Sequence, residues 1–355
     1  MNGLPKKSPQ GRGAAENPPN RFERLAWEDD AEAFDPEAPG PATQFFRDTS
    51  KSLIVENESP DVPFEASLNV YRGCEHGCVY CYARPYHEYL GFSAGLDFET
   101  KIMVKENAPQ LLRKELASPR WEPKVLAMSG VTDCYQPIEK KLKLTRACLE
   151  VLAEFRNPVG IVTKNHLVTR DLDLLQELAA VKGVSVYLSI TTLDAELARR
   201  LEPRASTPRH RLEAIEALAK AGIPVGVLTA PVIPALNDSE IPAILNAAAR
   251  AGARFAGYVM LRLPHGLAGL FETWLEEHYP DRRHKILHRL ESLRGGKRND
   301  PRFGKRMRGE GPFADQVAQL FEMGLKKAGM EKRGPELSTK DFRRPRPPQL
   351  SLFPA

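Results

Sequence analysis

The sequence predicts an α/β protein built on a parallel β-sheet with helices on its outside. Short buried runs rich in β-forming residues alternate with longer stretches whose apolar residues recur every three or four positions. Six such runs are present, and each of the first five is followed by a helical stretch. Alternating strand and helix units give a parallel sheet. Six units are too few for a closed eight-stranded barrel.

The elements follow one another regularly from residue 66 onward. Asn107 as an N-cap and Pro109 in the first turn predict the first long helix. Cys148 lies on the apolar stripe of the next helix and is expected in the core. Further helical stripes lie around residues 172–178, 212–218 and 241–248. The six expected strands are 66–70, 125–128, 159–162, 184–190, 223–228 and 255–261.

Composition divides the chain into four parts. Residues 1–60 are rich in proline, glycine and acidic residues without helix or strand periodicity, which predicts a mostly disordered N-terminal arm. Residues 61–263 form the expected core. Residues 264–330 are expected to be a basic helical extension with a helix at 314–323. Residues 331–355 are basic and proline-rich, and we expect an extended, disordered tail.

Overall composition indicates a cytoplasmic protein with no membrane partner. Five cysteines in 355 residues, three of them clustered, do not form a disulfide framework. The N-terminus lacks the apolar segment of a secretory signal, and no run approaches 18 apolar residues. The apolar share of 42% is sufficient for a substantial core.

Three cysteines, Cys74, Cys78 and Cys81, have C-x3-C-x2-C spacing directly after the first expected strand. Thiolates select iron–sulfur clusters or zinc. A [4Fe–4S] cluster usually takes four cysteines, so three would leave one iron without a protein ligand. The alternative is a structural zinc site with His76 or His87 as the fourth ligand. The chain has no second paired ligand motif of the kind that closed zinc sites use.

The loops after the other strands are the further candidates for the site. In barrels of βα units, catalytic groups lie at the carboxyl ends of the strands. Hydroxyl groups there suit a ribose and an aminoacyl group, and a lysine suits a carboxylate. The same residue types are also common in turns. The candidate segments are 129–137, 163–165, 188–192 and 229–234.

The cysteine spacing, with Tyr80 directly before the third cysteine, resembles the signature of radical S-adenosylmethionine (SAM) enzymes. The resemblance implies a partial (β/α)6 TIM-like barrel and a [4Fe–4S] cluster whose open iron is chelated by the amino and carboxylate groups of SAM. It also implies reductive SAM cleavage to a 5′-deoxyadenosyl radical that abstracts a hydrogen atom from substrate. The cofactors supply this chemistry, and the protein positions them.

Within the superfamily, residues 50–265 are similar to the spore photoproduct lyase branch and its uncharacterised bacterial relatives, through the cysteine loop, Thr-Asp-x-Tyr-Gln-Pro and Thr163-Lys164. By that resemblance Tyr80, Thr132, Lys164 and Ser189 contact SAM, with Lys164 on its carboxylate.

One position departs from the lyase pattern. The lyase has a hydrogen-donating cysteine three residues before the matching aspartate, and this chain has Gly130 there. Cys134 is the nearby candidate for a catalytic thiol, or else a plain buried one. Five further residues and segments are weaker candidates for the site: His87, Asp97, Glu99, Lys101 and 202–204.

Two C-terminal features suggest macromolecular partners. Between Arg282 and Arg308 there are 11 Lys or Arg and two acids, which suits contact with a phosphate backbone, or else forms a solvated face. The segment 349–353, Gln-Leu-Ser-Leu-Phe, is similar to the motif by which bacterial repair proteins dock on the DNA sliding clamp, although an apolar end can match it by chance.

The sequence therefore predicts a radical SAM enzyme that acts on nucleic acid, in DNA repair or modification, with a flavodoxin or ferredoxin as reductant. Radical modification of RNA or of a protein side chain is an alternative. A non-catalytic, metal-bearing nucleic-acid adaptor is another, and it predicts bound metal without SAM turnover.

Overall fold

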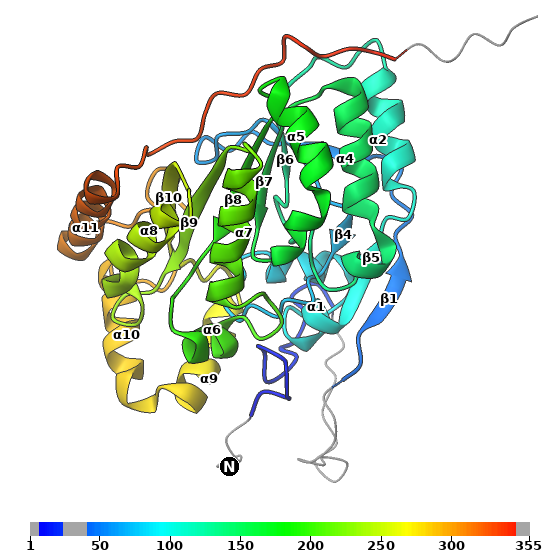
Figure 1. Cartoon of the computed structure of the whole chain (residues 1–355). Helices are drawn as coiled ribbons and strands as arrows, with labels where there is room; N and C mark the ends of the chain where they lie inside the picture. Colours follow the sequence, from blue (N-terminus) through cyan, green and yellow to red (C-terminus); the bar gives the residue numbers. More distant parts are fainter. Residues whose placement is uncertain (1–6, 24–40, 346–355) are drawn as a thin grey trace, which may run out of the picture.

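The computed structural model describes residues 7–23 and 41–345. Its main sheet has seven strands in the order β10-β9-β8-β7-β6-β3-β2 (Figure 1). The six strands from β3 to β10 are parallel, as predicted, and β2 pairs antiparallel with β3. Within the described residues the sheet stays open, with β10 and β2 at its edges. The strands are β2 (Ile54–Glu56), β3 (Ala66–Leu68), β6 (Leu126–Met128), β7 (Val159–Thr163), β8 (Val184–Ser189), β9 (Val225–Val232) and β10 (Phe255–Met260).

Five helices lie in a row over one face of this sheet (Figure 1). They are α2 (Ala108–Ala117), α4 (Leu144–Phe155), α5 (Leu172–Ala180), α7 (Pro208–Lys220) and α8 (Ile241–Arg250). Two short helical segments precede these helices, η1 (Arg84–Leu90) and α1 (Leu96–Thr100), and four lie between them in the sequence: α3 (Glu139–Leu142), η2 (His166–Asp171), α6 (Ala195–Leu201) and η3 (Asp238–Glu240). The helix predicted after Asn107 is present, although the Asn107 side chain makes no capping hydrogen bond.

The core lies between the sheet and these helices. In β8 the side chains of Val184, Val186 and Leu188 share one face of the strand and are fully buried in one cluster with apolar residues of α4, α5 and α7. Cys148 of α4 is buried in the same cluster, which confirms the prediction for that residue. The apolar stripes of the helices thus supply the cover that a parallel sheet needs.

Residues 41–60 correct the prediction of a disordered N-terminal arm. They form β2 and also β1 (Gln44–Arg47), which pairs with β5 (Lys101–Val104). Together with β4 (Tyr71–Arg72) these strands make a second, three-stranded sheet in the order β1-β5-β4. The strands β1 and β2 are too short, at four and three residues, for a period to show in the sequence.

Residues 7–23 are also held against the core. The backbone N–H groups of Gly13 and Ala14 donate to the two carboxylate oxygens of Glu99, at 3.0 and 2.9 Å. The Ala14 side chain is buried in an apolar cluster with Cys78 and Val79. This segment is therefore ordered by contacts with residues that are distant in the sequence.

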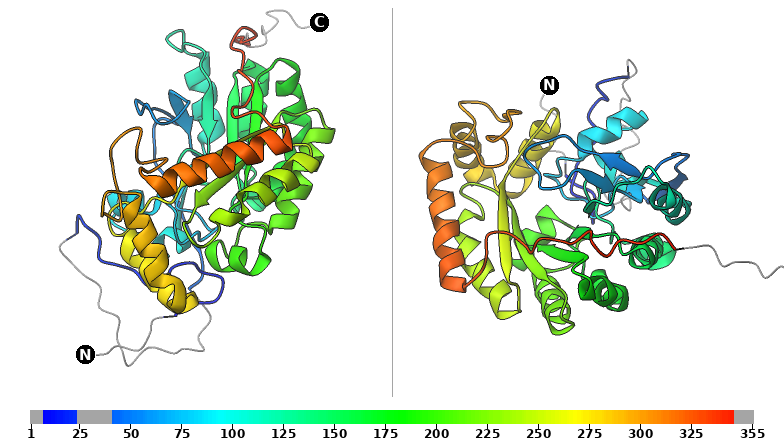
Figure 2. Two further views of the ribbon diagram at one scale, coloured as in Figure 1. Left: turned by 90° about the vertical axis from the view of Figure 1, so that its left-hand side faces the viewer. Right: turned by 90° about the horizontal axis from the view of Figure 1, so that it is seen from above.

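The C-terminal extension is helical, as predicted. It contains α9 (Leu267–His278), α10 (Pro280–Ser292) and α11 (Pro312–Ala328). Figure 2 shows α11 lying along the side of the molecule, where it packs on α8. The helix predicted at 314–323 is longer in the structure, because Pro312 starts it and Gly329 ends it in a left-handed conformation.

The tail is extended but not free in residues 331–345. It crosses the amino ends of the strands as a strap, visible in red in Figure 1. The N–H of Glu331 donates to Arg254 O at 2.8 Å, and that of Ser338 donates to Lys182 O at 2.9 Å. The Phe342 ring lies 6.3 Å from that of Phe155. The predicted clamp-binding segment 349–353 lies outside the described residues.

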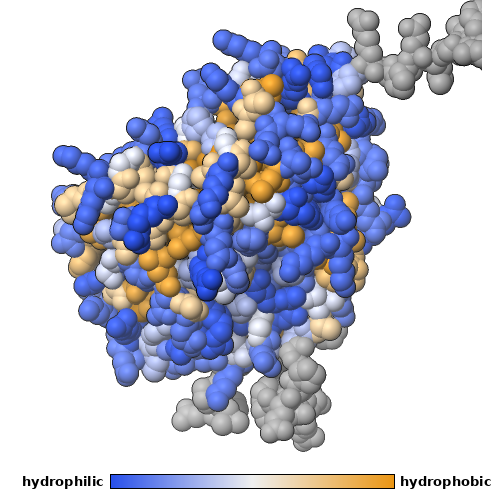
Figure 3. All heavy atoms as spheres, in the orientation of Figure 1, coloured by the Kyte–Doolittle hydropathy of each residue, from blue (hydrophilic) through white to orange (hydrophobic). Residues whose placement is uncertain are grey.

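Among the described residues, no helix is both long and apolar enough to span a membrane. Hydrophilic residues predominate on the face seen in Figure 3, with apolar residues gathered in smaller patches.

Candidate active site

The cysteine loop follows β4 at the carboxyl end of the main sheet. Cys74 and Cys78 are buried and Cys81 is partly exposed. The N–H of Cys74 donates to Phe98 O at 2.9 Å, and that of Cys81 donates to Cys78 O at 3.2 Å. Gly77 has a φ of +69° between the cysteines, a conformation that favours glycine. The loop therefore carries its three thiols on a tightly turned backbone.

A buried ion pair supports this loop from behind. The guanidinium of Arg84 lies 2.5 Å from the carboxylate of Glu99, and both side chains are fully buried. Arg84 Nε also donates to Cys78 O at 2.9 Å, and another of its nitrogens donates to Gly95 O at 2.8 Å. A buried guanidinium that donates to several carbonyls in this way fixes the backbone that carries the thiols.

The loop after β6 holds the other side of the cysteine loop. The Gln136 amide accepts from the N–H of Glu75 at 2.9 Å and donates to Gly73 O at 3.3 Å. In return, the Glu75 carboxylate accepts from the N–H of Ile138 at 2.7 Å. Glu75 also lies 3.1 Å from the guanidinium of Arg204. The Tyr-Gln-Pro run thus acts as a dock for the cysteine loop.

Asp133 joins three loops at the same edge of the sheet. Its carboxylate accepts from the Thr163 hydroxyl and from the N–H of Lys164, both at 2.7 Å, and lies 3.4 Å from His76 Nδ1. His76 Nε2 lies 3.1 Å from the amide of Asn165. Burial alone would raise the pKa of Asp133, but His76 and the backbone donors lower it to about 2.

Five polar side chains form what we call the strand-end cluster: Tyr80, Lys164, Ser189, Thr191 and Glu202. Lys164 Nζ donates to the Ser189 hydroxyl at 2.6 Å and lies 3.8 Å from the Glu202 carboxylate. The same ammonium is 5.9 Å from the centre of the Tyr80 ring. The Tyr80 hydroxyl donates to Glu202, and that of Thr191 does so at 2.5 Å. Three of the four predicted SAM contacts therefore lie together.

Arg211 of α7 balances the charge of this cluster. It is fully buried, bonds the Glu202 carboxylate and donates to Ser189 O at 2.8 Å. Burial alone would raise the pKa of Glu202, but Arg211 and Lys164 lower it to about 2. The cluster therefore keeps a carboxylate charged at a buried strand end.

The three thiols influence one another. Burial raises the pKa of Cys74 well above its usual range, and Asp133, Cys78 and Cys81 raise it further. Burial likewise raises the pKa of Cys78, with contributions from Glu202 and Cys81. Thiols at such a place need a cation before they ionise together.

A family model described as the radical SAM superfamily matches residues 68–248. The chain belongs to the radical SAM superfamily. The matched segment runs along the chain from the end of β3 into α8, and it includes the cysteine loop and the strand-end cluster. The predicted membership of this superfamily is confirmed.

Relatives of this radical SAM protein occur in bacteria and archaea. An uncharacterized protein of Mycobacterium tuberculosis is 40% identical over 222 residues, covering 62% of this chain and 65% of that protein. An uncharacterized protein of Methanocaldococcus jannaschii is 30% identical over 214 residues, covering 60% of this chain and 76% of that protein. The chain thus spans about 65% of the length of the mycobacterial relative.

Solved structures of spore photoproduct lyase share the fold. One mutant of that lyase has a TM-score of 0.58 with 19% identity, and the match covers 78% of each chain. Another, with bound AdoMet and dinucleoside spore photoproduct, has a TM-score of 0.57 with 18% identity and covers 81% of this chain and 80% of the lyase chain. The predicted likeness to the lyase is confirmed for the fold.

The radical SAM family implies a [4Fe–4S] cluster and SAM, and the donor set fits such a cluster. Cys74, Cys78 and Cys81 come from one fixed loop, and their thiols are close enough to shift one another's pKa. Within residues 7–23 and 41–345 no three ligands are already assembled around a metal position.

Thr132 and Cys134 lie apart from the strand-end cluster. The Thr132 hydroxyl donates to Tyr71 O at 3.1 Å. Cys134 is buried in the main hydrophobic core, unlike the three cysteines of the loop. A catalytic role for Cys134 stays a prediction, and its place in the core favours the alternative of a plain buried thiol.

Most of the weaker candidates make contacts that stabilise the surroundings of the site. Glu99 and Glu202 are in the buried ion pairs described above, and Arg204 pairs with Glu75. Asp97 pairs with Lys101 at 3.1 Å, in α1 and at its end. His87 is buried beside Phe92 and Phe98, and this burial lowers its pKa to about 4.

The basic run between Arg282 and Arg308 is largely engaged within the protein. Arg306 pairs with Asp61, Arg302 pairs with Asp300 at 2.5 Å, and Arg298 pairs with Glu272. Arg294 is buried and donates to Leu261 O at 2.8 Å. Much of the excess charge that the sequence displays is therefore neutralised in the fold.

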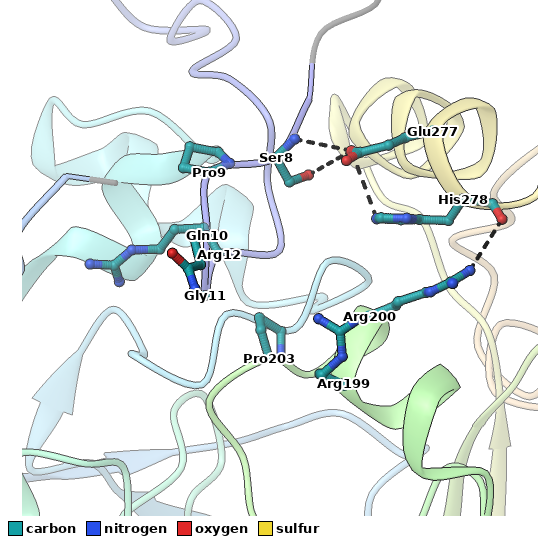
Figure 4. Close-up of a pocket in the computed structure, with 10 residues that line it drawn as sticks. All are labelled: Ser8, Pro9, Gln10, Gly11, Arg12, Arg199, Arg200, Pro203, Glu277 and His278. Atoms are coloured by element: carbon teal, nitrogen blue, oxygen red, sulfur yellow. Dashed lines mark hydrogen bonds and ion pairs between the residues drawn. The ribbon is translucent and has the colours of Figure 1, made fainter. Parts of the chain in front are cut away.

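A pocket of about 680 Å³ lies beside the site rather than in it (Figure 4). Its walls come from residues 8–12, from Arg199 and Arg200 near the end of α6, and from Glu277 and His278 of α9. No cysteine lines it. In Figure 4 the Glu277 carboxylate accepts from Ser8, so the pocket wall is part of the attachment of the N-terminal segment.

The sequence did not identify several residues that hold the site together. Arg211 lies on a helix whose period predicts only packing, and Arg84 is the first residue of the short 3-10 helix η1, which the sequence did not predict. Arg262, directly after β10, lies with its guanidinium 5.8 Å from the centre of the Tyr82 ring. The rule that functional residues lie at the carboxyl ends of the strands also applies to Arg262, and it could have identified this residue from the sequence.

Proposed function

We propose that this radical SAM enzyme cleaves SAM reductively beside the cysteine loop and abstracts a hydrogen atom from a nucleic-acid substrate, in repair or modification. One observation carries the SAM site: the strand-end cluster lies at the cysteine loop itself. Tyr80, between Cys78 and Cys81, bonds Glu202 and lies under Lys164.

Each group has a role in this proposal. Cys74, Cys78 and Cys81 would hold the cluster. When bound, the cluster supplies the electron that cleaves SAM, from a flavodoxin- or ferredoxin-like donor. Lys164 would bind the carboxylate of SAM through an ammonium that Ser189 already orients at 2.6 Å.

Two observations support nucleic acid as the substrate class. The net charge of +5 favours a polyanion. The fold is shared with spore photoproduct lyase, one structure of which contains a dinucleoside photoproduct. Gly130 stands where the lyase-like pattern has a cysteine, so the hydrogen atom would return to product by another route than in the lyase.

The test is an anaerobic assay of 5′-deoxyadenosine after iron and sulfide reconstitution, with SAM and dithionite. We expect about four irons per chain and SAM cleavage in the native protein. Cys78→Ala should lose both, whereas Cys148→Ala, a buried cysteine of the core, should keep both. Bound zinc without SAM cleavage would overturn the proposal in favour of a metal-bearing adaptor.

A further inference from the structure

An outward row of tyrosines lies next to the cysteine loop. The segment η1 is a 3-10 helix, in which residues three apart share a face. Tyr86 and Tyr89 are therefore on one face, and they are 56% and 69% exposed. Arg84 and His87 occupy the opposite, buried face. The period of three thus separates anchoring side chains from exposed rings.

Two further rings extend this row into a strip. Phe22, 54% exposed, stacks on Tyr89 with ring centres 4.8 Å apart. Tyr86 and Tyr89 have ring centres 6.4 Å apart. Tyr82, 44% exposed, directly follows Cys81 at the other end. We call these four residues, Phe22, Tyr89, Tyr86 and Tyr82, the aromatic strip.

The strip is fixed by the structure beneath it. Glu88 is buried and accepts from Arg21 Nε at 2.6 Å, which ties the Phe22 segment to η1. The Tyr82 hydroxyl donates to Gly130 O at 2.6 Å, in the loop after β6. Rings held in this way lose little conformational freedom when they bind a ligand.

Arg262 adds a positive charge at the inner end of the strip. Its guanidinium lies over Tyr82, and among the described residues its one hydrogen bond is to the sulfur of Met307 at 3.5 Å. It forms no ion pair with any residue that the structure describes, whereas the neighbouring Arg306 pairs with Asp61. A partly buried arginine without a carboxylate partner is suited to an external anion.

We propose that the aromatic strip and Arg262 bind a single-stranded nucleic acid, with bases stacked on the rings and a phosphate on Arg262. This inference rests on the proposed function, because it names the form in which the substrate reaches the cysteine loop. Rings of this kind accept any base, since every base has a π-face. The strip would direct the nucleic-acid strand toward Tyr82, which directly follows Cys81.

Spacing and charge favour nucleic acid over a protein partner. Tyr86 and Tyr89, with ring centres 6.4 Å apart, are both more than half exposed, so each offers a ring surface on which a base can stack. Two acids near the strip are engaged, Glu88 by Arg21 and Asp61 by Arg306, and Glu23 is the exposed acid beside Phe22 at the outer end. The charge left over at the inner end is the cation of Arg262.

The binding test uses the full-length protein and a dye-labelled oligothymidine, by fluorescence anisotropy at two salt concentrations. The double variant Tyr86→Ala/Tyr89→Ala should weaken binding at least about ten-fold with an unchanged salt dependence, because it removes stacking. Arg262→Ala should lessen the slope of log K against log salt by about 0.7, the value for one phosphate contact on a single strand.

The controls remove exposed side chains of the same kind, one apolar and one arginine, far from the strip in the sequence. Met323→Ala on α11 and Arg209→Ala on α7 should bind as the native protein does. A native protein that binds no oligonucleotide, or a tyrosine double variant that binds normally, would overturn the inference and assign the strip to a protein partner. Formation of 5′-deoxyadenosine without oligonucleotide is measured in parallel, because it tests the proposed function alone and should not change in the double variant.

Discussion

The two ends of the main sheet are built from different kinds of contact. At the carboxyl ends of the strands, the buried Glu202 and the partly buried Asp133 and Lys164 contact one another and the cysteine loop. At the amino ends, the tail 331–345 crosses the sheet through backbone hydrogen bonds and the ring contact of Phe342 with Phe155.

This difference suggests that the residues for catalysis are confined to the carboxyl ends of the strands, whereas contacts at both ends stabilise the fold. Removing a charge from water costs free energy, and a well-packed apolar group is often as stabilising as a buried ion pair. The charges at the carboxyl ends of the strands therefore indicate that the site requires their geometry. Backbone and apolar contacts suffice where only stability is needed. In barrels of βα units the carboxyl ends of the strands carry function, and the amino ends contribute to stability. The following variants test this division.

The largest effect is expected at the buried pair of Glu202 and Arg211. Glu202→Gln leaves the Arg211 guanidinium buried without a counter-charge, so the free energy of unfolding should fall by about 3–5 kcal/mol. Urea unfolding of the purified protein measures this loss. Glu213→Gln, which breaks the exposed pair with Arg209 on the same helix α7, should cost less than about 1 kcal/mol. Equal losses would contradict the comparison.

An intermediate effect is expected at Gln136. Gln136→Ala removes the hydrogen bonds to Gly73 and Glu75 and should cost about 1–3 kcal/mol. Iron content after reconstitution should fall as well, because the cysteine loop loses the hydrogen bonds that hold it against the loop after β6. Gln176→Ala removes an exposed amide that bonds Ala221 O and should change neither quantity. Full iron content in the Gln136 variant would show that the dock is not needed.

The smallest effect is expected at the amino ends. Phe342→Ala removes the ring contact with Phe155 and should lower the free energy of unfolding by about 1 kcal/mol. Iron content and SAM cleavage should stay at native values. Phe303→Ala, at an exposed ring, serves as the control with a smaller change in stability. Loss of iron in the Phe342 variant would break the separation of the two ends.

The repeating elements could be predicted because their signals are local. Each buried strand and each apolar stripe appears in one stretch of sequence, and the strand order follows from the alternation of the two. Cys74, Cys78 and Cys81 were recognisable for the same reason, since all three lie within eight consecutive residues. Lys164 and Ser189 followed from the rule that strand ends carry function.

Only the tertiary structure decided which charges meet. Glu202 and Arg211 lie nine residues apart, but Arg84 and Glu99, Arg204 and Glu75, and Arg306 and Asp61 join separate parts of the chain, and no spacing encodes them. The order in residues 7–23, 41–60 and 331–345 also came from long-range contacts. Short segments without a period gain structure only when the core offers donors, acceptors and apolar surface to them.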